Sequence, residues 1–168
     1  MPLDREWIER HIPHKGRMCL LDEVLAWDAA HIRCRSGTHR SAANPLRAHG
    51  RLGVACGIEY AAQAMAVHGA LIAASAPLAS TVATSVRGSI GAGVGYLASV
   101  RNVTLAVSDL DQLGEDLIAD AERITGDGRT VLYDFTVSCG RRPLLAGRAS
   151  IVFGTAVPAA PVGTGSDA

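Results

Sequence analysis

Three polar side chains interrupt an otherwise apolar stretch of the sequence, and they are the first candidates for chemistry. They are Glu59, Gln63 and His68, within LGVACGIEYAAQAMAVHGALIAAS at residues 52–75. A carboxylate among apolar neighbours is costly unless it is paired, protonated or used in a reaction. Glu59 is therefore the leading candidate for an acid or base, and Gln63, four residues later, shares its helix face. The alternative is a partly exposed glutamate that lies beside apolar residues without a role.

The sequence around these residues predicts one long helix over residues 52–75. The segment is rich in Ala, Leu and Met, contains no proline, and is closed by Pro77. It is apolar on nearly every side, which is typical of a helix that is buried all round. One face of a sheet would not cover so much apolar surface. We therefore expect a second subunit, commonly related by two-fold symmetry, to complete the burial.

Six other segments are predicted to be strands, two before the helix and four after it. They are residues 18–27, 31–39, 96–107, 117–124, 130–139 and 143–153. In the second strand, Ile32, Cys34 and Ser36 alternate with Arg33 and Arg35, as in a strand with one buried face. Strands joined by tight turns, with one apolar helix among them, favour an α+β fold in which an antiparallel sheet packs on the helix.

The chain is predicted to form a single domain, residues 1–154. A short helix is expected over residues 4–11, with Asp4 as its N-cap. Residues 77–95 are rich in Ser, Ala, Thr and Gly and read as a flexible connection; their RGSIGAGVG lacks the Lys-Ser/Thr of a P-loop. Residues 155–168 have no periodicity and are expected to be disordered.

The composition argues against several classes of protein. Sixteen Lys and Arg balance sixteen Asp and Glu, so the formal net charge is zero and nucleic acid is not an obvious partner. The N-terminus is too polar for a signal peptide, and Glu59 interrupts the one long apolar run, so we expect no membrane span. The cysteines form no CxxC pair, and neither a metal nor another cofactor is expected. Reduced thiols are typical of a cytoplasmic protein. These cysteines are Cys19, Cys34, Cys56 and Cys139.

Three segments resemble a known family in order and spacing. They are HIPHKGRMCLLDEV at residues 11–24, IEYAAQAMAVHG at residues 58–69, and the predicted closing strands between residues 110 and 153. This pattern resembles the 3-hydroxyacyl-acyl carrier protein dehydratases, which have the hotdog fold. It is most similar to a divergent branch, the dehydratase-like proteins of aryl-polyene gene clusters. The resemblance covers about residues 8–153.

The resemblance implies a dimer in which each acyl chain runs between two hotdog subunits. The acid of the family's helix falls on Glu59, and the family's glutamine falls on Gln63, which we place with the substrate-binding residues. Backbone amides of Gly53, Val54 and Ala55 would bind the thioester carbonyl, where the helix dipole favours developing negative charge.

The family's catalytic histidine is where the sequence departs from the pattern. Aligned without gaps, that histidine falls on Pro45. If the loop is shortened, His49 takes its place instead. The alternative for His49 is a loop histidine that faces solvent.

Dehydration of a 3-hydroxyacyl thioester needs a base for the C2 proton and an acid for the C3 hydroxyl, and Glu59 with His49 is the pair that we predict. Two other functions stay open: a thioesterase that uses the helix carboxylate, and a non-catalytic acyl-binding subunit of a dehydratase complex. The thioester would be carried by acyl carrier protein or coenzyme A, and the dimer would be a homodimer or a heterodimer. An acidic carrier protein would dock on basic side chains. The candidates are Arg47, Arg51, Arg101, Arg141 and Arg142.

Overall fold

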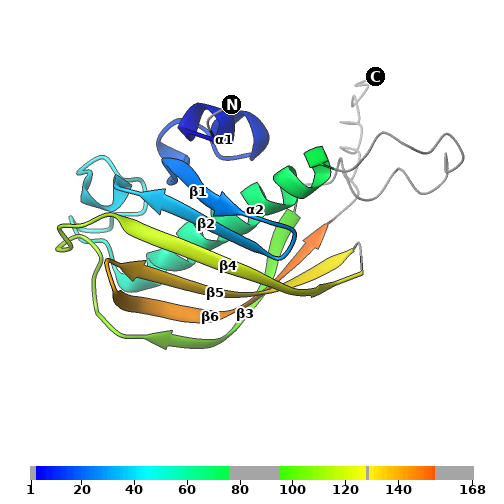
Figure 1. Ribbon diagram of the computed structural model, residues 1–168. Helices are drawn as coiled ribbons and strands as arrows, with labels where there is room; N and C mark the ends of the chain where they lie inside the picture. The colour runs from blue at the N-terminus through cyan, green and yellow to red at the C-terminus, as the bar shows by residue number, and fades with distance from the viewer. Residues whose placement is uncertain (1–2, 76–94, 128, 154–168) are drawn as a thin grey trace, which may run out of the picture.

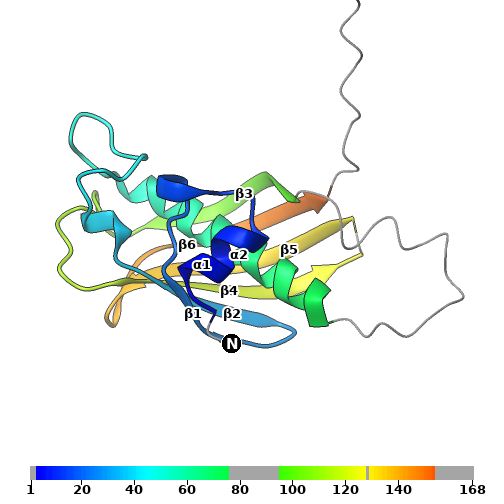
Figure 2. The same ribbon diagram turned by 90° about the horizontal axis from the view of Figure 1, so that it is seen from above.

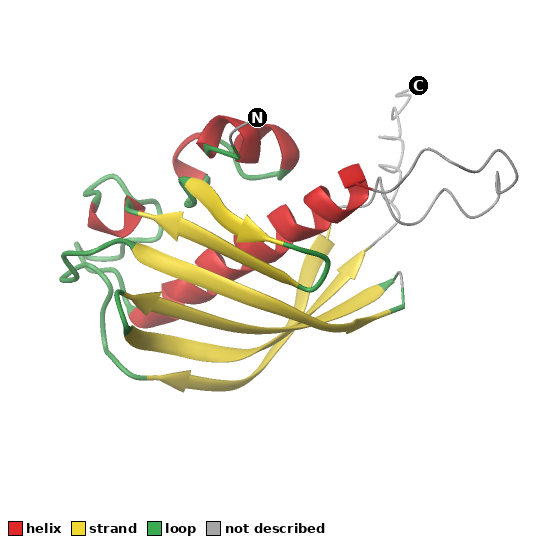
Figure 3. Cartoon of the chain, in the orientation of Figure 1, coloured by secondary structure: helices red, strands yellow, loops and turns green. Residues whose placement is uncertain are grey.

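One long helix lies against a curved antiparallel sheet, as a computed structural model of the chain shows (Figures 1 and 3). The structure describes residues 3–75, 95–127 and 129–153. The predicted tail at residues 155–168 and nearly all of the predicted connection at residues 77–95 lie outside these ranges.

The sheet has six strands in the order β1-β2-β4-β5-β6-β3, and all neighbours are antiparallel. β1 and β3 are therefore the two edge strands (Figure 1). The strands are β1 (Glu23–Trp27), β2 (His31–Ser36), β3 (Gly95–Leu105), β4 (Leu117–Gly126), β5 (Thr130–Cys139) and β6 (Arg142–Phe153). This architecture is the predicted hotdog fold, with an antiparallel sheet wrapped around one central helix.

The central helix is α2 (Gly57–Ser75), which packs against β2, β4 and β5. The short helix α1 (Arg5–His11) packs against α2, as the view from above shows (Figure 2). Asp4 caps α1 by accepting a hydrogen bond from the amide of Trp7, as the sequence predicted. Trp7 and Ile8 face inward, also as expected.

Two predicted boundaries are wrong by several residues. The first strand begins at Glu23 instead of Met18, because the backbone before it is bonded to side chains. The carbonyl of Leu20 accepts hydrogen bonds from the hydroxyls of Ser36 and Thr38, and its amide donates to Gln63. The second strand ends at Ser36, because Thr38–Arg40 forms a 3₁₀ turn.

The helix also begins later than predicted, at Gly57. Val54–Cys56 forms a separate 3₁₀ turn in front of it. A Cβ on Gly57 would lie 2.2 Å from Cδ2 of Leu145, so the absence of a side chain lets the start of α2 approach β6 closely. The first turn of α2, which carries Glu59, is thereby held against the sheet.

Burial along α2 differs between its sides. The side facing the sheet is buried and includes His68, whose ring contacts the Tyr133 hydroxyl through Nδ1 at 3.0 Å and the Asp28 carbonyl through Nε2 at 2.8 Å. The other side carries small residues that stay partly exposed or line a pocket. These are Ala62, Ala66, Gly69, Ala70 and Ala73.

Candidate functional site

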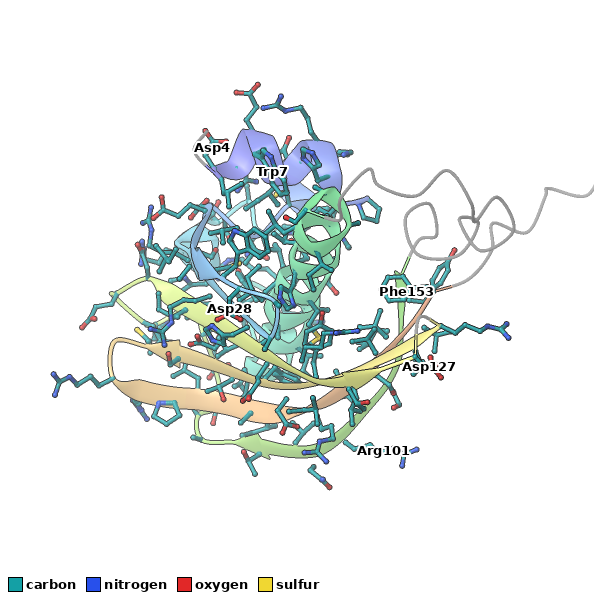
Figure 4. All side chains as sticks on the ribbon, turned by 45° about the vertical axis from the view of Figure 1, so that its right-hand side comes forward. Asp4, Trp7, Asp28, Arg101, Asp127 and Phe153 are labelled. Carbon is teal, nitrogen blue, oxygen red and sulfur yellow. The ribbon has the colours of Figure 1, made fainter. Side chains whose placement is uncertain are left out.

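A pocket of about 640 Å³ lies along the uncovered side of α2. Its walls are the small side chains of α2, the segment from His11 to His14, the first residues of β3, and side chains of β5 and β6 such as Tyr133 and Phe153. Figure 4 shows Phe153 at the end of β6 and Trp7 on α1. Most of the lining is apolar, as in sites that bind an extended hydrocarbon. Its lining includes one carboxylate, Glu59, and two imidazoles, His11 and His14.

Glu59 lies in the first turn of α2, with its side chain 31% exposed. Its Oε1 accepts a hydrogen bond from Nε2 of Gln63 at 3.0 Å and lies 3.1 Å from Nε2 of His14. Glu59 is thus partly exposed, which agrees with the alternative of a partly exposed glutamate. It differs from that alternative because its carboxylate is paired and lines a pocket. Within the described residues, Oε2 has no hydrogen-bond partner and is the oxygen available to a bound molecule.

Gln63 is fully buried and its amide is used within the protein. Its Oε1 accepts from the amide of Leu20 at 2.8 Å, and its Nε2 donates to the carbonyl of Met18 at 2.8 Å and to Glu59. It is not part of the pocket lining. The structure therefore gives Gln63 contacts that fix Glu59 and the segment before β1, and the predicted substrate contact stays a prediction.

His14 is the functional candidate that the sequence did not reveal. It precedes η1 (Gly16–Met18), a 3₁₀ turn, and its side chain is 30% exposed beside Glu59. The two residues are 45 positions apart. The only available signal was the position of His14 in the family-like opening segment, which does not show where that segment lies relative to the helix.

His49 lies outside the pocket of its own subunit. It is exposed and occupies a tight turn in which Ala48 and Arg51 exchange backbone hydrogen bonds of 2.9 and 3.0 Å. Both central residues have positive φ, 51° at His49 and 76° at Gly50, as in a type I′ turn. This geometry places His49 at the tip of a turn, and within one subunit the structure does not bring it to Glu59.

The predicted carbonyl-binding amides lie in the turn that precedes α2. The amide of Val54 donates to the carbonyl of Ser108 at 3.0 Å and is therefore occupied. Gly53 is partly exposed and Ala55 is exposed. Their amides remain candidates for binding a thioester oxygen.

The predicted docking arginines fall into two groups. Arg47 donates to the carbonyls of His39, Ser41 and Gly50, so it holds its own loop together. Arg51 pairs with Asp109. The other three are exposed, on β3 and at the turn between β5 and β6. They are Arg101, Arg141 and Arg142.

Burial shifts the pKa values of His68 and Tyr133, which contact each other between α2 and β5. It lowers the pKa of His68 below its ordinary value of 6.5 and raises the pKa of Tyr133 to about 12. Both groups are therefore neutral near pH 7. In the described part of the chain, no three His, Cys, Asp or Glu side chains are grouped so that they could hold a metal ion. None of the described helices is long and apolar enough to cross a membrane.

The comparison with protein families decides which family this site belongs to. The model of the ApeP-like family, described as ApeP dehydratase, matches residues 6–157. The chain belongs to the ApeP-like dehydratase family. The predicted resemblance to dehydratase-like proteins is thereby confirmed.

Solved structures share the fold of this ApeP-like chain. The dehydratase heterocomplex ApeI:P from Xenorhabdus doucetiae contains a chain of 22% identity that superposes with a TM-score of 0.70, over 92% of this chain and 91% of that one. A mutant thioesterase from Pseudomonas aeruginosa has 13% identity and a TM-score of 0.51, over 78% and 79% of the two chains. A thioesterase from Haemophilus influenzae has 10% identity and a TM-score of 0.51, over 79% and 78%. No curated protein matches the chain in sequence.

Proposed function

We propose that this ApeP-like protein takes part in the dehydration of a 3-hydroxyacyl thioester, with Glu59 as the acid or base and the acyl chain in the pocket along α2. The observation that carries the proposal is a carboxylate that lines an apolar pocket of about 640 Å³, with one oxygen held by Gln63 and His14 and the other without a partner among the described residues. Membership of a dehydratase family supports the reaction type.

The chemistry requires two proton transfers. A base removes a proton from C2, the electron pair of that C–H bond forms the C2=C3 double bond, and the C3 hydroxyl leaves as water after receiving a proton. Glu59 Oε2 is placed for one of these transfers. We assign the other to His49, as the resemblance implied, and this imidazole would have to come from the loop of a second subunit. The amides of Gly53 and Ala55, at the turn before α2, are suited to the thioester carbonyl.

The edge strand β3 also favours binding of a second subunit. Among the residues that the structure describes, seven large hydrophobic side chains are exposed, and four of them lie on this one strand: Tyr96, Leu97, Val103 and Leu105. An unpaired, apolar edge strand favours pairing with another chain. Tyr96 and Leu97 also line the pocket, so a subunit on β3 would close it. We therefore propose a hotdog dimer, either of two copies or with another hotdog subunit; the related ApeI:P structure is a dehydratase heterocomplex.

The acyl donor would be acyl carrier protein or coenzyme A. For the carrier protein, we propose docking on Arg141 and Arg142, which are exposed at the start of β6. Arg101 lies on β3, which the second subunit would cover, and Arg47 holds its own loop. The cytoplasmic location stays a prediction.

The assay that tests the proposal offers purified protein three thioesters: 3-hydroxyacyl, enoyl and saturated acyl. We expect interconversion of the first two and no hydrolysis of the third. Hydrolysis of the saturated thioester would instead identify a thioesterase, a function that other proteins of this fold have. Binding of all three thioesters without turnover, by the protein alone and with a hotdog partner, would identify an acyl-binding subunit. The position of His49 outside the pocket of its own subunit favours this second candidate.

The assignment of His49 has its own test. His49→Ala should slow dehydration about a hundredfold, the usual scale for losing a positioned acid or base, while acyl binding changes little because the pocket wall lies elsewhere. Light scattering on the variant checks that the dimer persists. Unchanged turnover in an intact dimer would remove His49 from the mechanism.

A further inference from the structure

We propose that His14 is a positioning residue for Glu59, which with Gln63 holds Oε1 of the carboxylate and leaves Oε2 to the substrate. This inference rests on the proposed role of Glu59 and adds a residue that neither the sequence pattern nor the family match assigns. It is a contact within one subunit, and it is independent of the origin of the second catalytic group.

The contacts of the His14 ring determine where its proton lies. Nε2 is 3.1 Å from Glu59 Oε1, an oxygen that can only accept when ionised. Two lone pairs at this distance would repel each other, so Nε2 carries a proton toward the carboxylate. Nδ1 is buried and has no partner among the described residues, so a proton there would be left without an acceptor. The contacts therefore place a proton on Nε2, directed at the carboxylate.

The two contacts on Oε1 come from one supported unit. Gln63 approaches it from the next turn of α2 at 3.0 Å, and Gln63 is itself fixed by the backbone of Met18 and Leu20. His14 belongs to the same segment that provides this backbone. The segment from His14 to Leu20 thus restrains the carboxylate directly through an imidazole and indirectly through Gln63. A carboxylate restrained at one oxygen presents the other in a fixed direction, which is what proton transfer at C2 or C3 requires.

Turnover of three variants tests the role. His14→Ala removes the contact, His14→Gln replaces the imidazole by an amide N–H donor, and His31→Ala is the matched control. His31 Nε2 also lies 3.1 Å from a carboxylate, that of Asp120, on the sheet and away from the pocket. We expect His14→Ala to lower kcat about tenfold to a hundredfold, the range for a hydrogen bond to a charged group, with little change in KM. His14→Gln should recover most of kcat, and His31→Ala should match the unsubstituted protein. An unchanged kcat in His14→Ala would overturn the proposal. If folded His14→Gln lost as much kcat as His14→Ala, the proposal would also be overturned, because the imidazole would then do more than donate a hydrogen bond.

A second measurement does not depend on turnover. In the full-length chain with ¹⁵N-labelled histidine, the signals of His14 are those that disappear in His14→Gln. We expect a proton on Nε2, and Glu59→Gln should shift the His14 signals while those of His31 stay in place. An Nε2 without a proton, or His14 signals unchanged in Glu59→Gln, would overturn the proposal. If the protein dehydrates no thioester, the proposed function fails, while the NMR result still decides whether His14 makes this contact.

Discussion

At the scale of single residues, the site is a carboxylate held by side chains from a distant segment. The sequence identified Glu59 because a charge stands out in an apolar helix, and it placed Gln63 beside Glu59 because residues four apart share a helix face. It could not identify His14, because the contact joins residues 14 and 59, and no local pattern shows which segment packs on the first turn of α2. His49 precedes the helix in sequence, but it lies at the tip of a turn and does not line the pocket of its own subunit.

Gln63 should matter for stability as well as for the site. Gln63→Leu keeps a similar volume but leaves the amide of Leu20, which is fully buried, without an acceptor. We expect a loss of about 1–3 kcal/mol in the free energy of unfolding, measured with urea, since this is the usual cost of an unsatisfied buried donor. Gln112→Leu, at an exposed position, is the control and should change the value little. An equally stable Gln63→Leu protein would mean that these hydrogen bonds contribute nothing net.

At the scale of elements, the strands after α2 follow their sequence pattern closely, whereas the boundaries before it do not. β5 was predicted within its observed bounds because alternation and flanking glycines mark it on both sides. Cys19, Leu20 and Leu21 are apolar and buried like a strand. The backbone of Leu20, however, bonds to the side chains of Gln63, Ser36 and Thr38 instead of to the backbone of a neighbouring strand. Apolar character alone does not distinguish these two arrangements.

The buried histidine of α2 makes stability depend on pH. Burial lowers the pKa of His68 below 6.5, so as pH falls through about 6.5 the unfolded chain binds a proton that the folded chain does not. The free energy of unfolding should therefore be highest above this pH and decrease as pH falls toward the folded pKa. His39, which is buried with its pKa lowered mainly by burial, adds to the same slope.

Urea titrations at a series of pH values measure this slope. His68→Asn, which can still bond to Tyr133 and Asp28, should reduce it. A slope that stays the same in His68→Asn would show that other groups produce it.

At the scale of the whole molecule, one subunit leaves apolar surface that a second subunit would cover. The helix was predicted to be buried all round, and the sheet covers one side of it, leaving small residues along a pocket that β3 borders. The sequence therefore indicated the need for a second surface. It did not show that β3 carries most of the large apolar side chains that are exposed in the described part of the chain, because its residues alternate no more clearly than those of buried strands.

A charge on β3 should weaken the dimer. Leu105, 52% exposed on β3, and Leu25, 46% exposed on β1 at the opposite edge, form a matched pair. We expect Leu105→Asp to raise the dissociation constant at least about tenfold, because it places a carboxylate in an apolar interface. Leu25→Asp should leave the constant unchanged, as followed by light scattering over a dilution series. A monomeric unsubstituted protein at micromolar concentration, or equal effects of the two substitutions, would contradict pairing along β3.

The most direct test of the central claim is the turnover of Glu59→Gln on a 3-hydroxyacyl thioester. The substitution keeps an oxygen that can accept hydrogen bonds from Gln63 and His14. It replaces Oε2 by an amide nitrogen, which acts neither as an acid nor as a base near neutral pH. We predict a decrease in kcat of about a hundredfold or more, with the fold, the dimer and acyl binding unchanged. Full turnover by Glu59→Gln would contradict the account, because the carboxylate facing the pocket would then be neither the acid nor the base of the reaction.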